Sequence, residues 1–154
     1  MQGGAYQRAI ARRLPGAVVT ARACPLFVAL AEEGWTEGPI VEAVAHRYLD
    51  DMFAADADDR PDTLVLGCTH FPVVAPTLQQ VLGPAVAVVD SAGTTAAALA
   101  GTLAEHGLAR PPGPAGGSIG LLATAGAERF ARVGGIFLGR PLGAAQVEIV
   151  DLAG

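Results

Sequence analysis

Short apolar runs alternate with segments of helical periodicity, and this alternation restricts the possible folds more than any other feature of the chain. Four runs have the length and apolar content of buried strands: 16–21, 63–67, 85–89 and 118–124. Larger apolar residues recur at helical spacing in three segments: 37–55, 72–82 and the region around Phe130, Val133 and Phe137. Strands separated by single helices indicate βαβ units. We therefore predict an α/β fold with a mainly parallel sheet and flanking helices.

A linker rich in proline and glycine, 109–118, divides the chain unevenly. Three strand–helix units precede it, whereas one strand, one helix and a short strand within 146–152 follow it. Two or three elements cannot bury both faces of a parallel sheet. We therefore expect the C-terminal piece to dock on something else. The chain also opens directly in helix-like sequence, 1–14, although a parallel α/β sheet usually begins with a strand.

Composition and charge exclude several classes of protein. The chain has 154 residues, 51% of them hydrophobic, and a net charge of −5 without a cluster of basic residues, so it has no footprint for nucleic acid. Cys24 and Cys68 are far apart and no signal peptide is visible, which favours free thiols in a reducing compartment. No apolar stretch has the length of a membrane span. We expect a soluble, cytoplasmic protein that binds neither nucleic acid nor membrane.

Cys68, Thr69 and His70 directly follow the predicted strand 63–67, and Pro72 is well placed at the start of the next helix. This turn therefore lies at the carboxyl end of a strand, where open α/β sheets bind their ligands. The N–H groups of a helix start attract anions, and together with a nearby imidazole they favour the thiolate form of a cysteine. The hydroxyl of Thr69 can donate a hydrogen bond to a carboxylate. The turn is a candidate site for an anionic substrate.

Several interpretations of this turn remain open. A buried cysteine is often only a small apolar side chain. Cys68 and His70 supply two metal ligands without a recognisable second pair, and Cys24 and His46 fall at no standard spacing, so we predict no metal. A Cys–His hydrolase also needs an orienting Asn or Asp and an oxyanion hole, and neither can be assigned from the sequence. The hydrolase stays open from these residues, and proton transfer by a thiolate is the third option.

The stretch LGCTHFPVV, residues 66–74, is similar to the C-terminal cysteine motif of glutamate racemases. Other segments resemble that family in the same order: GAYQRAI (4–10), ACPLFVALAEEGW (23–35), VVDSAGTTA (88–96) and ERFARVGGIFLGRPL (128–142). The resemblance covers almost the whole chain. Aspartate racemase-like members of the wider aspartate/glutamate racemase superfamily tend to carry an acidic residue after Cys-Thr, so His70 favours glutamate.

The resemblance implies a cofactor-independent interconversion of L- and D-glutamate that supplies D-glutamate for peptidoglycan. Such a reaction needs two bases on opposite faces of the Cα atom, and thiols suit this role near neutral pH. Cys68 matches the second catalytic cysteine of the family, which acts on L-glutamate, and His70 matches the histidine that assists it. Thr69 matches a contact to the substrate carboxylate. Glu32 matches a glutamate near the substrate, with a role in positioning the ammonium group or its neighbours.

The departures from the family concern its earlier half. The Asp-Ser-Gly segment and the Cys-Asn-Thr segment with the first catalytic cysteine do not occur in this sequence. We therefore expect an incomplete two-domain fold. Residues 1–95 are then most of the second α/β domain without its first strand, and residues 96–154 are a return segment that completes the absent first domain.

On this interpretation the N-terminal half of a racemase is the missing partner, and the isolated chain has little or no activity. An exposed apolar seam would favour self-association, for example as a homodimer. Two other functions remain as alternatives: a Cys–His hydrolase, and a non-catalytic amino-acid-binding module of the same superfamily.

Overall fold

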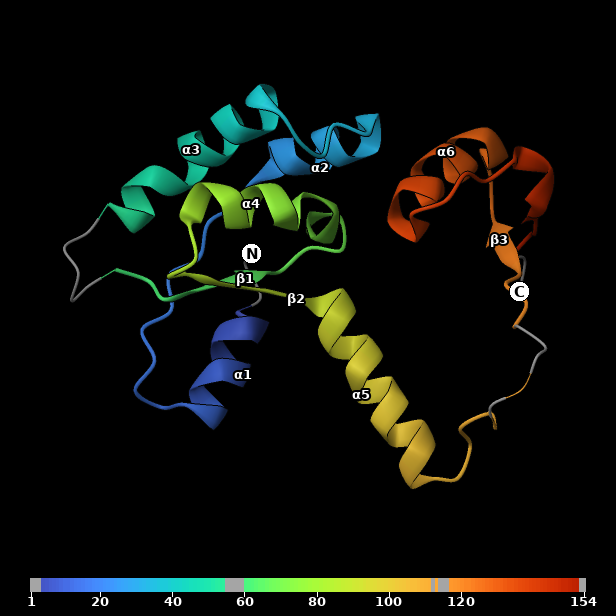
Figure 1. The fold of residues 1–154 in the computed structure, drawn as a ribbon, viewed down its shortest axis with the longest axis horizontal. Coiled ribbons are helices and arrows are strands. Elements are labelled where there is room, and N and C mark those ends of the chain that lie inside the picture. Colours follow the sequence, from blue (N-terminus) through green and yellow to red (C-terminus); the bar gives the residue numbers. More distant parts are fainter. Residues whose placement is uncertain (1–3, 55–59, 112, 114–116, 153–154) are drawn as a thin grey trace.

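The computed structural model describes residues 4–54, 60–111, 113 and 117–152 (Figure 1). Its elements in chain order are α1 (Ala5–Arg13), α2 (Pro25–Glu33), α3 (Pro39–Phe53), β1 (Thr63–Leu66), the 3-10 helix η1 (Phe71–Val74), α4 (Ala75–Leu82), β2 (Ala87–Asp90), α5 (Ser91–Glu105), β3 (Leu121–Ala123), α6 (Ala127–Leu138), the 3-10 helix η2 (Ala144–Gln146) and β4 (Val147–Ile149). Within these described ranges the helices outnumber and flank the strands, and the predicted α/β class is confirmed.

The strands form two separate parallel pairs. β1 pairs with β2, from Thr63 opposite Ala87 to Leu66 opposite Asp90. β3 pairs with β4 beyond the linker, from Leu121 opposite Val147. Each pair is a two-stranded sheet. The described chain thus holds two small parallel sheets, one on each side of the linker.

The prediction of a strand at 16–21 is wrong. These residues form neither helix nor strand, and the side chain of Val18 is 95% exposed. A parallel strand exists only where a neighbour accepts its backbone hydrogen bonds. Within the described part of the chain β1 pairs with β2 alone, so this apolar run has no strand beside it. Two strands, and not three, therefore precede the linker.

The predicted helices are present, with shifted ends. The pattern over 37–55 corresponds to α3, and that over 72–82 becomes η1 followed by α4. Asp90 caps α5, because its carboxylate accepts a hydrogen bond of 2.8 Å from the backbone N–H of Gly93.

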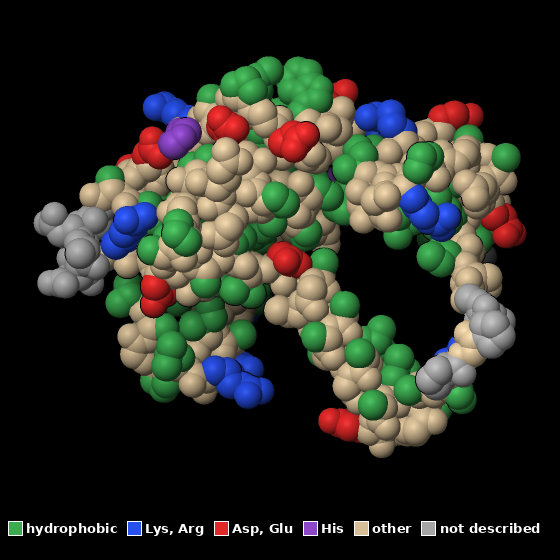
Figure 2. Space-filling view, viewed as in Figure 1, with side chains coloured by type: hydrophobic (Ala, Val, Ile, Leu, Met, Phe, Trp, Pro, Cys, Tyr) green, Lys and Arg blue, Asp and Glu red, His purple; other side chains and the backbone are tan. Residues whose placement is uncertain are grey.

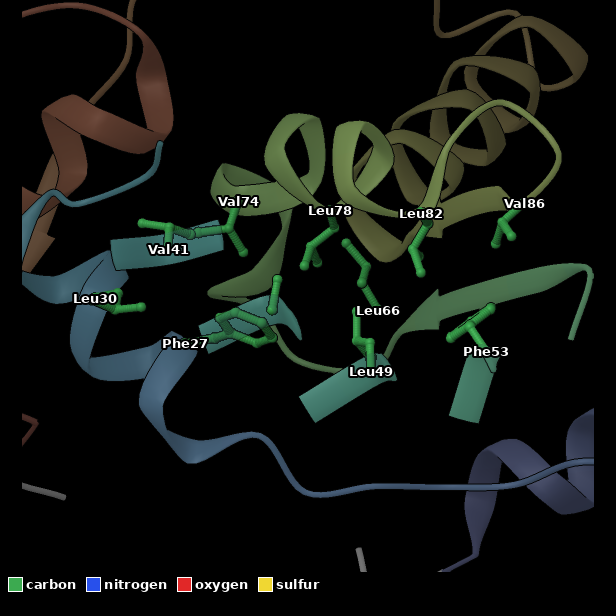
Figure 3. Close-up of a cluster of buried hydrophobic side chains, with 11 residues drawn as sticks. Phe27, Leu30, Val41, Leu49, Phe53, Leu66, Val74, Leu78, Leu82 and Val86 are labelled. Atoms are coloured by element: carbon green, nitrogen blue, oxygen red, sulfur yellow. The ribbon is translucent and has the colours of Figure 1, made fainter. Parts of the chain in front are cut away.

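The main core lies between one face of the β1–β2 sheet and helices α2, α3 and α4 (Figure 3). Its buried members are Phe27, Leu30, Val41, Ala45, Leu49, Phe53, Leu66, Val74, Leu78, Leu82 and Val86. Alternate residues of a strand point to opposite faces of the sheet. Leu66 therefore points into this core, whereas Val65 and Val89 remain exposed on the other face. This sheet is packed on one side only.

The segment after the linker forms a second, smaller unit of β3, β4, η2 and α6. Ala131 and Val147 are its buried apolar residues. This unit meets the main core where α6 contacts α2. Helix α5, which precedes the linker, has no buried residue among its 15. Figure 2 shows an open gap between α5 and the C-terminal unit. No described helix has the length and hydropathy needed to cross a membrane.

Candidate functional site

The turn of Cys68, Thr69 and His70 lies between the end of β1 and the start of η1, as predicted. The backbone N–H of Phe71 donates a hydrogen bond of 3.2 Å to the carbonyl oxygen of Cys68 and closes the turn. Cys68 and His70 are half-buried, whereas Thr69 is exposed. Because β1 and β2 are parallel and end together, the turn sits at the carboxyl edge of this sheet.

Three side chains form a line through this turn. The Sγ atom of Cys68 lies 4.0 Å from Nδ1 of His70, and Nε2 of His70 lies 2.9 Å from Oε1 of Glu32. The side chains of His70 and Glu32 are 28% and 23% exposed. A carboxylate only accepts hydrogen bonds, so Nε2 carries a proton in this contact. In a neutral imidazole Nδ1 is then unprotonated and faces the thiol.

The other oxygen of Glu32 is held by the C-terminal unit. Two guanidinium nitrogens of Arg129 donate to Oε2, at 2.7 and 3.2 Å, and Arg132 donates to the backbone carbonyl of Glu32 at 2.7 Å. The Arg129 guanidinium, followed by the contact with His70, holds the pKa of the Glu32 carboxyl below its usual range. Glu32 in turn raises the pKa of Arg129. The carboxylate form of Glu32 is therefore stabilised from both sides.

No pattern in the sequence pointed to Arg129 and Arg132. They lie in a segment that resembles the family, but 97 and 100 residues separate them from Glu32. Only the docking of α6 against the end of α2 brings them to the site.

Tyr6 and Phe137 border the turn. A Cβ atom at Gly67 would lie 3.2 Å from a ring carbon of Tyr6, so a close approach and not a positive φ favours glycine there. The rings of Phe137 and His70 meet edge to face, with centroids 5.9 Å apart. An open groove of about 610 Å³ runs from Glu32 along α6 to β3, and Glu32 and Arg129 are the charged residues of its otherwise largely apolar lining.

The structure thus brings Cys68, His70 and Glu32 together and leaves Cys24 elsewhere. Cys24 lies at the start of α2, whereas Glu32 lies near the end of that helix. Burial raises the pKa of the Cys24 thiol. His46 is exposed on α3, 2.8 Å from Asp50. Among the residues that the structure describes, no group of three or more His, Cys, Asp or Glu side chains is placed to hold a metal ion.

Known proteins resemble this chain in sequence. No family model matches it. A glutamate racemase of Koribacter versatilis is 38% identical over 97% of the chain and 57% of its own length. One of Geobacter metallireducens is 41% identical over 93% of the chain and 51% of its own length. The chain therefore spans about half the length of the curated relatives it matches.

Solved structures give the same result. A Thermus thermophilus glutamate racemase in complex with β-chloro-D-alanine has a TM-score of 0.77 and 37% identity, over 98% of this chain and 52% of its own. A Francisella tularensis glutamate racemase in complex with D-glutamate has a TM-score of 0.78 and 30% identity, over 98% and 54%. By sequence and by fold, this chain belongs to the glutamate racemase family.

Proposed function

We propose that this chain carries one wall of a glutamate racemase active site, which interconverts L- and D-glutamate without a cofactor. D-glutamate made in this way supplies peptidoglycan synthesis. The observation that supports the proposal most directly is the line from Cys68 through His70 to Glu32 at the carboxyl edge of a parallel sheet. That a relative from Francisella tularensis binds D-glutamate supports the choice of substrate.

In this proposal the thiolate of Cys68 takes the α-proton of L-glutamate, and the electron pair of the broken C–H bond stays on the substrate. A second base on the opposite face, in its protonated form, then delivers a proton to Cα and yields D-glutamate. His70 assists Cys68, since its Nδ1 atom lies 4.0 Å from the sulfur. Thr69, exposed in the same turn, donates a hydrogen bond to the substrate carboxylate. Glu32 orients His70 and lies near the ammonium group of the substrate.

The second base belongs, in this proposal, to a facing α/β domain that residues beyond these 154 contribute. Residues 1–95 are most of one racemase domain, and 96–154 return to complete the other. Three uncovered surfaces support this division: the outer face of β1–β2, helix α5, and the C-terminal sheet, in which Leu122 and Ile149 are exposed. Uncovered apolar surfaces of this kind mark interfaces. The 154 residues alone are then inactive as a racemase.

Incubation of the chain with L-glutamate in D₂O tests the proposal. NMR follows deuterium at Cα, and optical rotation follows inversion. We expect slow exchange without inversion, loss of this exchange in Cys68→Ser, and no change in Cys24→Ser, the matched control. Racemisation at an ordinary enzymatic rate by the chain alone would overturn the claim of inactivity. Exchange that survives in Cys68→Ser would overturn the role of Cys68.

A complementation experiment tests whether a separate facing domain supplies the second base. The chain is co-expressed with the part of the Geobacter metallireducens relative that it does not match, and we expect the pair to co-purify and to racemise glutamate. Light scattering on the chain alone measures self-association. A homodimer that racemises glutamate without the added half would contradict the proposed partner.

A Cys–His hydrolase is the second candidate, because Glu32 provides the orienting carboxylate that the sequence alone could not assign. This alternative predicts catalytic turnover of an activated ester through a covalent acyl-enzyme at Cys68, which mass spectrometry detects. A non-catalytic amino-acid-binding module predicts instead that glutamate binding is unaffected by Cys68→Ala and His70→Ala. Neither result is expected if Cys68 transfers protons.

A further inference from the structure

The carboxylate of Glu32 joins three segments that are far apart in the sequence. It lies near the C-terminal end of α2, its Oε1 atom meets His70 in the turn after β1, and its Oε2 atom meets Arg129 in α6. The contact with Arg129 is the one that comes from beyond the linker. It links the C-terminal unit directly to the candidate site.

The two arginines of α6 contact different parts of Glu32, one the side chain and the other the backbone. Arg129 donates twice to Oε2, which leaves Oε1 to face His70. The two N–H groups converge on one oxygen, so the contact locates Oε2 and leaves Oε1 as the acceptor that faces Nε2 of His70. Hydrogen bonds between ionised partners, such as these, are the stronger ones. Arg132 instead donates to the backbone carbonyl of Glu32. Arg129 therefore holds the side chain, and Arg132 holds the end of the helix that carries it.

Folding stability alone does not account for the Arg129 contact. The Arg129 side chain is 71% exposed, and exposed ion pairs add little to stability. The docking of α6 has other supports, because Ile136 packs on Gly34 and Phe137 on His70. The two hydrogen bonds to Oε2 are better suited to placing the Glu32 carboxylate than to adhesion.

We propose that Arg129 is a positioning residue: it fixes Glu32 against Nε2 of His70 and thereby keeps the unprotonated Nδ1 atom turned towards Cys68. The inference rests on the proposed function, in which Cys68 and His70 act together on the α-proton. The inference adds that Glu32 on α2 and the turn after β1 reach the geometry for proton transfer only when α6 is docked.

The tautomer of His70 provides a test that does not depend on activity. The full chain is labelled with ¹⁵N-histidine, and ring-nitrogen chemical shifts are recorded at about pH 9, above the usual titration of imidazole. His70→Asn identifies the signals of His70 among those of the three histidines. We expect the Nε2–H tautomer in the wild type, a mixture of tautomers in Arg129→Met, and an intermediate result in Arg129→Lys. Arg132→Met, the matched control, should keep the wild-type tautomer.

Unchanged His70 signals in Arg129→Met would overturn the inference, and so would an equal change in Arg132→Met. Circular dichroism establishes that each variant is folded, and Arg129→Gln replaces Arg129→Met if the latter is not. In the Cα exchange assay we expect Arg129→Met to lower the rate at saturating glutamate by about tenfold with little change in KM. A tautomer change together with an absence of exchange in every variant, wild type included, would support the positioning role and contradict the proposed function.

Discussion

Nε2 of His70 lies 2.9 Å from a carboxylate oxygen of Glu32, a residue 38 positions earlier in the chain. This contact joins the end of α2 to the turn after β1. It depends on the packing of α2 beside the β1–β2 sheet and not on any local pattern. Effects of pH and of substitution on this contact therefore report on the tertiary structure of the site.

Glu32→Gln should make the unfolding of the chain depend less on pH. The pKa of Glu32 is lowered in the folded state from its ordinary value of 4.5, chiefly by Arg129 and then by His70. The unfolded chain therefore binds a proton at higher pH than the folded chain does, and the stabilisation is lost as the pH falls from this value through the lowered pKa. We expect the melting temperature of the wild type to exceed that of Glu32→Gln at pH 7 and the difference to narrow as the pH falls below 4.5. Glu33→Gln, at the exposed neighbouring position, is the control, and a difference that stays constant with pH would refute the linkage.

Leu78→Ala should destabilise the main core strongly. The side chain of Leu78 is 1% exposed and lies between α4 and the sheet. We expect the free energy of unfolding to fall by about 2–5 kcal/mol, since truncation leaves a cavity. Urea unfolding measures this loss. Leu108→Ala, at a position 70% exposed, should change the free energy by less than about 0.5 kcal/mol, and similar losses at both positions would contradict the described core.

Asp90→Ala should remove the cap of α5. The carboxylate of Asp90 accepts the backbone N–H of Gly93, a group that has no partner within the helix. We expect a loss of about 1 kcal/mol in the free energy of unfolding, measured by urea titration. Asp90→Asn keeps an accepting oxygen and should retain most of the stability. Equal losses in the two variants would show that charge, and not the cap, matters here.

Gly67→Ala should strain the contact between α1 and the turn. The new Cβ atom would lie 3.2 Å from a ring carbon of Tyr6, closer than normal packing. We expect a loss of about 0.5–1 kcal/mol in the free energy of unfolding, since the half-exposed ring of Tyr6 must shift to admit the new atom. Adding Tyr6→Ala should remove most of this penalty, and strict additivity of the two changes would contradict the contact. Gly101→Ala is the control, because nothing lies within 4 Å of that position in α5, and it should stabilise the chain by about 0.5–1 kcal/mol.

Cys24 should react slowly with iodoacetamide at neutral pH. Burial raises the pKa of its thiol, and alkylation requires the thiolate. In the Cys68→Ser background Cys24 is the one remaining cysteine, so mass spectrometry gives its rate directly. We expect a rate below that of free cysteine that increases with pH, and a rate equal to that of free cysteine at pH 7 would contradict the burial.

Much of the architecture could be predicted from local patterns. The runs 63–67 and 118–124 became β1 and β3, the helical periodicity over 37–55 became α3, and the Cys–Thr–His turn lies at the strand end where it was expected. These predictions rest on the spacing of apolar residues, which records the face that an element buries. The apolar run 16–21 satisfied the same pattern and formed no strand. A strand needs a hydrogen-bonding neighbour, and no local pattern reports whether one is present.

The sequence by itself thus determined the α/β class, most of the helices and the turn that holds Cys68 and His70. The tertiary structure alone decided that Glu32 meets His70 and that Arg129 holds Glu32 from the far side of the linker. The physical reason is the range of the interactions. Periodicity and capping act over a few neighbouring residues, whereas these side-chain contacts join residues 38 and 97 positions apart and exist only when α2, β1 and α6 have packed together.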